Sequence, residues 1–218
     1  MNFLDSQAKK SFDAVVEKIE ATSSVEAVIA IRGRSASYYH VHAVAAVLCV
    51  FGVLAYTLFA EQVFSLIWII LLPFMAGVGG AVFVESVPGA RRVGTSERQR
   101  QHATQRAARA TFVELGVHHT TSRCGVLFYY SLLERKCSVI ADLGVVVAVP
   151  AAELAALEVQ LGVAISAGGV ATARAMEHVL PLLKMLPRSA VDRNELPDAL
   201  NVQVSRLPIR ARLFGGRV

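Results

Sequence analysis

The stretch AVAAVLCVFGVLAYTLFAEQVFSLIWIILLPFMAGVGGAVFV, residues 43–84, holds two uncharged apolar runs separated only by Glu61 and Gln62. The runs are residues 43–60 and 63–84. A helix needs about 20 apolar residues to cross the hydrocarbon core of a bilayer, with a range of about 17–25. Because so short a joint connects only antiparallel neighbours, the stretch predicts a transmembrane helical hairpin over residues 40–86.

The composition agrees with a membrane segment, because 54% of the residues are hydrophobic and only 18% are charged. Soluble domains typically have about 45–50% and about 25%. The excess lies between Ala43 and Val84. A buried helical pair of a soluble protein is the alternative, and the run Leu66 to Phe74 without a polar residue argues against it.

The second apolar run contains one proline and three glycines. Pro73 predicts a kink. Gly77, Gly79 and Gly80 resemble part of a nucleotide-binding loop, but they lie within an apolar span. Small residues in such spans let two helices approach closely. We therefore expect them to pack the hairpin.

The residues that flank the hairpin are basic, and the joint between the spans has no Lys or Arg. The first span follows Arg32 and Arg34, and the second precedes six arginines: Arg91, Arg92, Arg98, Arg100, Arg106 and Arg109. Lys and Arg concentrate in cytoplasmic loops. We expect a multi-pass protein of a bacterial inner membrane with both termini in the cytoplasm. This topology explains the net charge of +5, so we expect the lipid bilayer and an unknown protein as partners and no nucleic acid.

The rest of the chain predicts one α/β domain that the hairpin interrupts. We expect its first part at residues 1–34 and its remainder at residues 95–187. The first part has a helix with Phe12, Val15, Val16 and Ile19 on one face, then a strand over 25–31. The remainder has a helix over 96–115, strands over 125–132 and 137–142, and helices over about 150–166 and 169–186.

The order of these elements predicts the sheet. The first two strands pair in parallel through the 96–115 crossover, and the next two form an antiparallel hairpin. A turn centred on Glu134 and Arg135 pairs Ser131 with Ser138 and keeps Cys124 far from Cys137. Helices then cover the faces of the mixed sheet. The fold class is therefore α/β, a three-layer α/β/α sandwich interrupted by a transmembrane helical hairpin.

Residues 188–218 form a polar and basic C-terminal tail, without an acidic residue after Asp198. The composition favours a disordered end, and docking on anionic lipid is the alternative. The three cysteines show no zinc-binding or disulfide spacing. Structural thiols are the simplest interpretation.

Five residues form a candidate polar site: Glu26, His118, His119, Arg123 and Asp142. Asp142 ends an apolar strand, and a lone buried carboxylate is costly unless it is paired. Arg123 or a backbone turn would satisfy it. The C-terminal ends of strands in α/β sheets also bind ligands. The two adjacent histidines are expected to diverge, which disfavours one shared metal ion.

Three segments resemble the TPM-domain family, in its bacterial membrane branch with a two-span insertion after the first strand. They are EKIEATSSVEAVIAI (17–31), LGVHHTTSRCGVLFYYSLLERKCSVIADLGVVVAVP (115–150) and DRNELPD (192–198). The resemblance covers roughly residues 3–200 and implies an α/β/α sandwich. Some relatives are acid phosphatases, and others bind calcium or act as interaction modules without chemistry.

The chain lacks several acids of the soluble relatives, since none lies between Asp142 and Glu153. Only Asp142 and Glu26 match positions that carry over. The resemblance therefore implies a non-enzymatic interaction or assembly module without a cofactor, with calcium as the possible ligand. The alternative is a metal-assisted acid phosphatase, with Asp142 as ligand or nucleophile and His119 or Arg123 on the phosphate.

Overall fold

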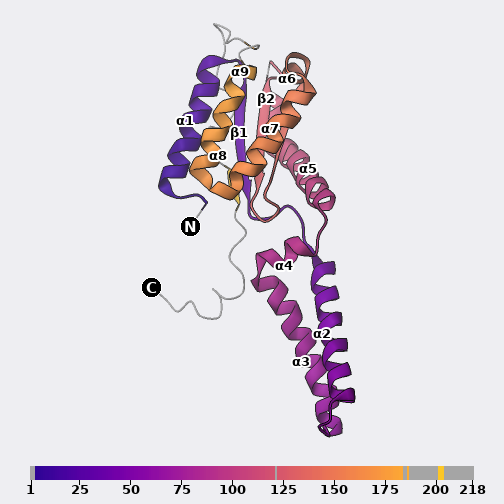
Figure 1. The fold of residues 1–218 in the computed structure, drawn as a ribbon. Helices are drawn as coiled ribbons and strands as arrows, with labels where there is room; N and C mark the ends of the chain where they lie inside the picture. The colour runs from indigo at the N-terminus through magenta and orange to yellow at the C-terminus, as the bar shows by residue number, and fades with distance from the viewer. Residues whose placement is uncertain (1–2, 121, 184–185, 187–200, 204–218) are drawn as a thin grey trace. The chain divides into compact units, whose positions relative to one another are not determined.

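The computed structural model describes residues 3–120, 122–183, 186 and 201–203 (Figure 1). The chain forms two compact units. One comprises Met1–Ala36 and Arg98–Ser205, and the other includes Ser37–Glu97. The first unit has a mixed α/β fold, and the second is helical. The segment DRNELPD lies outside the described residues.

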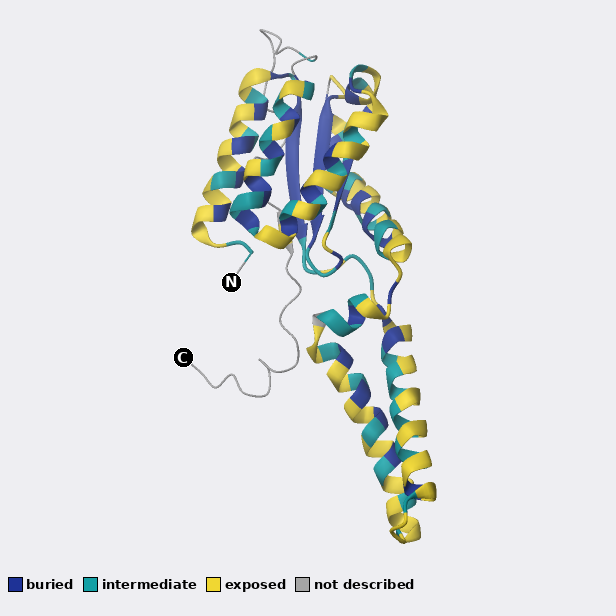
Figure 2. Ribbon diagram, in the orientation of Figure 1, coloured by how far each residue is buried: buried dark blue, intermediate teal, exposed yellow. Residues whose placement is uncertain are grey.

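The first unit is built on a sheet of order β3-β2-β1-β4. β1 (Glu26–Arg32) pairs in parallel with β2 (Gly125–Ser131), and β2 pairs antiparallel with β3 (Lys136–Ala141). The predicted parallel and antiparallel pairs are therefore both present. All seven residues of β2 are buried, as Figure 2 shows for the centre of the sheet. A strand buried on both faces needs apolar residues in near-continuous runs.

The predicted register of the β2–β3 hairpin is wrong by two residues. Ser131 pairs with Lys136, and Tyr129 pairs with Ser138. The turn closes earlier because the side chain of Glu134 points inward, where it accepts hydrogen bonds from the hydroxyl of Ser131 and the backbone N–H of Ser35. A shift of two residues keeps every side chain on the same face of the sheet. Cys124 and Cys137 are both free and buried.

β4 (Asn201–Gln203) is a strand that the sequence analysis missed, since it lies in the segment predicted as a disordered tail. It pairs in parallel with the end of β1, from Ala30 to Arg32. The other residues of the predicted tail are outside the described part of the chain. Three residues carry too little pattern to be recognised as a strand.

Apolar residues gather on both faces of the sheet. Alternate residues of β1, such as Ile29 and Ile31, pack with α1 (Ser6–Thr22), α7 (Ala151–Ala164), α8 (Gly169–Met176) and α9 (Leu180–Leu183). The residues between them, Val28 and Ala30, pack with α5 (Glu97–Glu114). The predicted helical face of α1 is buried at Phe12, Val15 and Ile19.

The C-terminal helices are more divided than predicted. α6 (Leu143–Ala148) was missed, because LGVVVA is rich in β-branched residues and reads as a strand. Its N-cap is Asp142, whose side chain accepts a hydrogen bond from the N–H of Leu143. The predicted helix 169–186 consists of α8, a 3₁₀ turn over Glu177–Val179 and α9. Gly168, at φ 106°, begins α8 in a conformation that favours glycine.

The second unit contains α2 (Tyr39–Phe59), α3 (Leu66–Ser86) and the short α4 (Pro88–Val93). α2 and α3 are both long and apolar enough to cross a membrane. Only 11% of the most apolar window of α2 and 22% of that of α3 is buried. Figure 2 shows this exposure along both helices. A large exposed apolar surface of this kind is typical of a membrane or protein interaction site.

Two of the three glycines in α3 pack the hairpin as expected. A Cβ on Gly77 would lie 2.7 Å from Cγ2 of Val50, and a Cβ on Gly80 would lie 2.7 Å from Sγ of Cys49. Gly79 has no atom within 4 Å of such a position, so the prediction of close packing is wrong for this glycine. Pro73 lies within α3 on the same buried face as Gly77 and Gly80.

Candidate functional site

Arg123 and Asp142 form a two-pronged ion pair between the start of β2 and the end of β3. Arg123 Nε donates to Oδ2 of Asp142 at 3.1 Å, and Nη2 donates to Oδ1 at 3.1 Å. The Asp142 side chain is 6% exposed, whereas that of Arg123 is 59% exposed. The burial cost of the carboxylate is thus offset by a cation that remains in water.

The backbone around the pair is also tied together. Oδ1 of Asp142 accepts a hydrogen bond from the N–H of Leu143 at 2.8 Å, and the N–H of Asp142 donates to the carbonyl of Gly125 at 2.9 Å. The N–H of Gly144 donates to the carbonyl of Arg123, whose φ is 55°. Such a φ is uncommon for a residue with a side chain. The Asp142 carboxylate therefore accepts hydrogen bonds both from Arg123 and from the backbone turn. These are the two alternatives that the sequence offered.

The candidate residues lie at the edge of the sheet where the parallel strands begin. β3 runs antiparallel, so its last residues reach the start of β2, and Glu26 pairs with Gly125 at the same edge. The expectation that Asp142 lies where strands of an α/β sheet bind ligands is therefore wrong, because that edge holds the carboxyl ends of the parallel strands. Glu26 is 8% exposed.

His118 and His119 lie in a 3₁₀ turn, Val117–His119, that precedes β2. Their ring centroids are 4.0 Å apart, so the expected divergence of the two side chains is wrong. The ring of His118 also packs 6.1 Å from that of Phe112 in α5. Nδ1 of His118 and Oγ1 of Thr120 are buried and have no hydrogen-bond partner among the described residues. The turn is thus polar and packed against α5.

The oxygens that Asp142 would offer to a calcium ion or a phosphate ester already have partners within the chain. Both carboxylate oxygens of Asp142 accept hydrogen bonds from Arg123, and one also caps α6. A cation would have to displace the guanidinium. Over the described ranges, no three residues among His, Cys, Asp and Glu gather in a way that suits a metal ion. In the structure, the pair links β2, β3 and α6.

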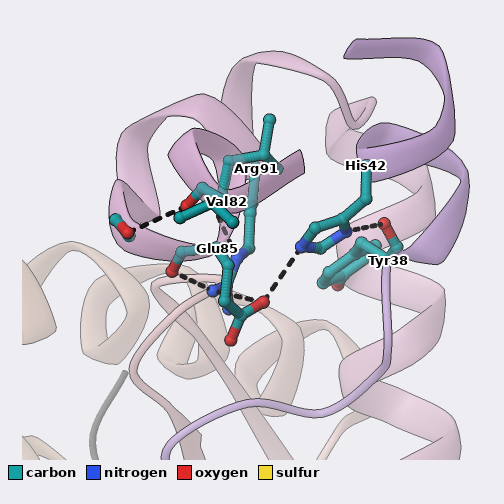
Figure 3. Close-up of polar contacts among 7 residues, drawn as sticks. Tyr38, His42, Val82, Glu85 and Arg91 are labelled. Atoms are coloured by element: carbon teal, nitrogen blue, oxygen red, sulfur yellow. Dashed lines mark hydrogen bonds and ion pairs between the residues drawn. The ribbon is translucent and has the colours of Figure 1, made fainter. Parts of the chain in front are cut away.

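A second polar cluster lies at one end of the helical hairpin and was missed by the sequence analysis (Figure 3). Glu85 lies near the end of α3. Its Oε2 is 2.9 Å from Nε2 of His42 and 2.8 Å from Nη2 of Arg91. Nδ1 of His42 is 3.0 Å from the carbonyl oxygen of Tyr38. The cluster links the start of α2 to the end of α3.

Arg91 closes the C-terminal end of α3. Its Nε donates to the carbonyl of Val84 at 3.1 Å, and its Nη2 donates to the carbonyl of Glu85. These carbonyls are among the last four of the helix, which have no partner within it. A cation there also interacts favourably with the helix dipole. The sequence analysis used Arg91 only as a topology signal, and the neighbouring acid Glu85 was the clue to this second role.

A third polar cluster lies at the carboxyl ends of β1 and β2. Glu134 is 2% exposed and accepts a hydrogen bond from the N–H of Ser35 at 3.0 Å and from the hydroxyl of Ser131. The hydroxyl of Ser35 lies 2.8 Å from that of Ser131 and 3.2 Å from that of Tyr129. Burial raises the pKa of Tyr129, and its hydrogen bond to Ser35 lowers it in part. These hydrogen bonds hold Ser35, in the segment that follows β1, against the end of β2.

Comparisons with known proteins support the fold alone. No protein-family model matches the chain, and no curated protein matches it. Among solved structures, the chain is similar to the NMR structure of the BA42 protein from the psychrophilic bacterium Bizionia argentinensis. The two are 13% identical, with a TM-score of 0.54, over 93% of this chain and 97% of the other.

Proposed function

We propose that the chain is a membrane-anchored interaction or assembly module that does no chemistry. The observation that carries this proposal is the pair of apolar helices α2 and α3, whose large side chains point outward along their whole length. Examples are Leu48, Phe51 and Phe74, each at least 64% exposed. In lipid this exposure carries no hydrophobic cost, and the helical backbone is satisfied within each helix.

The proposed location is a bacterial inner membrane, with both termini on the cytoplasmic side. The support is the distribution of charge. Arg91 and Arg92 follow α3 directly, whereas the joint between the spans carries Glu61 and no basic residue. Both ends of the hairpin return to the α/β unit, so this unit lies on one side of the bilayer.

We further propose that the α/β unit belongs with the TPM-domain proteins and is a three-layer α/β/α sandwich. The support is the set of motifs around His118–Gly144 and the packing of helices against both faces of the sheet. The fold that the chain shares with BA42 is compatible with this proposal. A family model built from close homologues of this chain would test it.

The interaction role is supported by exposed apolar side chains outside the hairpin. Leu143, Val146 and Val147 lie on one face of α6, and each is at least 51% exposed. Val159 and Val163 lie one turn apart on α7 and are 69% and 71% exposed. No Lys or Arg occurs from Cys137 to Ala173. This surface suits an apolar protein partner.

Membrane extraction and a phosphatase assay together test the proposal. The full chain should remain in the membrane pellet after alkaline carbonate washing, and a C-terminal reporter should be active only in the cytoplasm. The detergent-purified chain should not hydrolyse a generic phosphate ester. Release by carbonate or a periplasmic reporter would refute the topology. Turnover that Asp142→Asn abolishes, in a chain that remains folded, would establish the phosphatase alternative instead.

A further inference from the structure

α5 exposes a row of basic side chains along one face. Arg98, His102, Arg106 and Arg109 are all exposed. At about 100° per residue these four positions fall within an arc of about 80°. We call these four residues the basic stripe. Acidic residues of α5 occur only at its two ends, Glu97 and Glu114.

The opposite face of α5 is committed to the sheet. Thr104, Ala108 and Thr111 are buried, and Ala108 packs with Val28, Ala30 and Leu127. The basic stripe therefore faces away from the sheet. Arg100 is off the stripe, and its Nε is buried. Of the arginines of α5, Arg98, Arg106 and Arg109 are therefore the ones that an external partner can contact.

In the proposed topology, the covalent chain limits the distance between the stripe and the bilayer. α5 begins after the ten residues 87–96 that follow α3, and ten residues span at most about 36 Å. In the proposed topology, the cytoplasmic leaflet is thus within reach of α5. Such leaflets carry anionic lipids, which attract basic segments next to a membrane span.

We propose that the basic stripe docks α5 on anionic lipid headgroups, so that the α/β unit rests on the membrane surface with α5 against it. The inference rests on the membrane topology proposed above. Each arginine near an anionic surface favours the docked state by roughly fivefold. The three arginines together favour it by roughly a hundredfold. Docking of this kind orients the face of the unit that bears α6 and α7, on the other side of the sheet from α5, away from the lipid.

Lipid suits the stripe better than single-stranded nucleic acid does. Binding of single-stranded nucleic acid usually combines basic side chains with exposed aromatic rings on which bases stack. Phe112, the one Phe, Tyr or Trp of α5, packs with the sheet cluster and with His118. Apart from the imidazole of His102, the stripe has no ring on which a base could stack. A row of basic side chains matches a fluid layer of headgroups, which needs no fixed geometry.

The test measures the distance from α5 to the lipid in the full chain. The variant Ala110→Cys carries a water-soluble maleimide dye on an exposed position of α5, since Cys124 and Cys137 are buried and Cys49 lies in α2. The protein is reconstituted into vesicles that contain a headgroup-labelled acceptor lipid. The vesicles are either phosphatidylcholine alone or phosphatidylcholine with phosphatidylglycerol. Energy transfer should be higher in the anionic vesicles, and added salt should remove the difference.

The stripe variant Arg98→Gln, Arg106→Gln, Arg109→Gln should lose that difference. The matched control Lys9→Gln, Lys10→Gln, Arg174→Gln removes three exposed charges from α1 and α8 and should keep it. Equal transfer in the two kinds of vesicle would overturn the inference, as would an equal loss in the control. Displacement of the dye-labelled helix from anionic vesicles by duplex DNA at low concentration would also overturn it, in favour of nucleic acid. Carbonate extraction reports separately whether the chain is integral, so failure of the topology is distinguishable from failure of docking.

Discussion

Gly80 of α3 packs directly against Cys49 of α2, so closely that a Cβ on the glycine would lie 2.7 Å from Sγ and 3.1 Å from the carbonyl oxygen of Ala45. Helices in lipid gain little from the hydrophobic effect, and close van der Waals contact holds them together. The contact between these two residues is therefore part of what closes the hairpin.

Replacing Gly80 should open the hairpin, whereas replacing Gly79 should not. Gly80→Leu forces a side chain into the space of Cys49 and a backbone carbonyl, and overpacking of this kind costs about 1–3 kcal/mol. Gly79→Leu is the matched control, because its Cβ would meet no atom within 4 Å. Thermal unfolding of the two variants in the same detergent measures the difference. Equal melting temperatures would show that the glycine contact does not stabilise the hairpin.

Asp142 should matter for stability because of its hydrogen bonds. Asp142→Ala removes the N-cap of α6 and the bonds from Arg123, and we expect a loss of about 2–3 kcal/mol in unfolding free energy. Asp142→Asn keeps an oxygen that can accept from Leu143 and should cost about half as much. Denaturant unfolding of the detergent-solubilised chain measures both losses. A loss for Asp142→Asn as large as that for Asp142→Ala would mean that the charge, and not the cap, dominates.

The sequence could predict the ion pair of Asp142 but not its place in the sheet. A buried carboxylate requires a partner, and the sequence offered Arg123 or a backbone turn. The edge at which the pair lies depends on the direction of β3. The predicted antiparallel direction is confirmed, and it brings the end of β3 to the start of β2. The need of a buried carboxylate for a partner is thus local and readable from the sequence, whereas the end of the sheet at which it lies depends on the topology.

The errors in the sheet have a common physical cause. The alternation of side chains in a strand has a period of two, so a two-residue error in the β2–β3 register leaves the buried and exposed pattern unchanged. The buried side chain of Glu134 favours the observed register, and its partner Ser35 is distant in the sequence. β4 depends in the same way on long-range pairing with β1.

The contact between Glu134 and Ser35 leads to another stability prediction. Glu134→Ala leaves the N–H of Ser35 and the hydroxyl of Ser131 without this acceptor in a buried site, which costs about 2–4 kcal/mol. Glu134→Gln keeps one oxygen acceptor and should cost less. Hydrogen exchange at the amide of Ser35 measures the local effect, and it should accelerate strongly only in the alanine variant. Slow exchange in Glu134→Ala would contradict the role assigned to the carboxylate.

Burial of Cys137 predicts a loss of stability at alkaline pH. Desolvation raises the pKa of this thiol well above its usual value, and the neighbouring Glu158 raises it further. The folded chain therefore keeps the proton at a pH where the unfolded chain, with a thiol pKa of about 8.5, releases it. The contribution to stability is complete below about pH 8.5 and declines above it, by at most about 1.4 kcal/mol per pH unit.

Denaturant unfolding at a series of pH values from about 7 to about 9.5 measures this decline. Cys137→Ala removes the titrating group, so its stability should fall less steeply with pH than that of the unchanged chain. Tyr130 is also buried, and burial raises its pKa, but an unfolded tyrosine titrates only near pH 10. Identical pH slopes for the two proteins would exclude Cys137 as the cause.

Arg91 should stabilise the end of α3 independently of its effect on topology. Its side chain bonds to the carbonyl of Val84 and to the carboxylate of Glu85, and only 8% of the residue is exposed. Arg91→Ala leaves these acceptors without the guanidinium, and we expect a loss of about 2–3 kcal/mol. Arg92→Ala removes the same charge one residue further along and is the matched control for topology. Since many arginines flank the hairpin, both variants should keep a cytoplasmic C-terminus by the reporter assay.

Hydrogen exchange over residues 85–95 should accelerate in Arg91→Ala and change little in Arg92→Ala. Equal acceleration in both would show that charge near the membrane, and not the capping geometry of Arg91, holds this end of the hairpin.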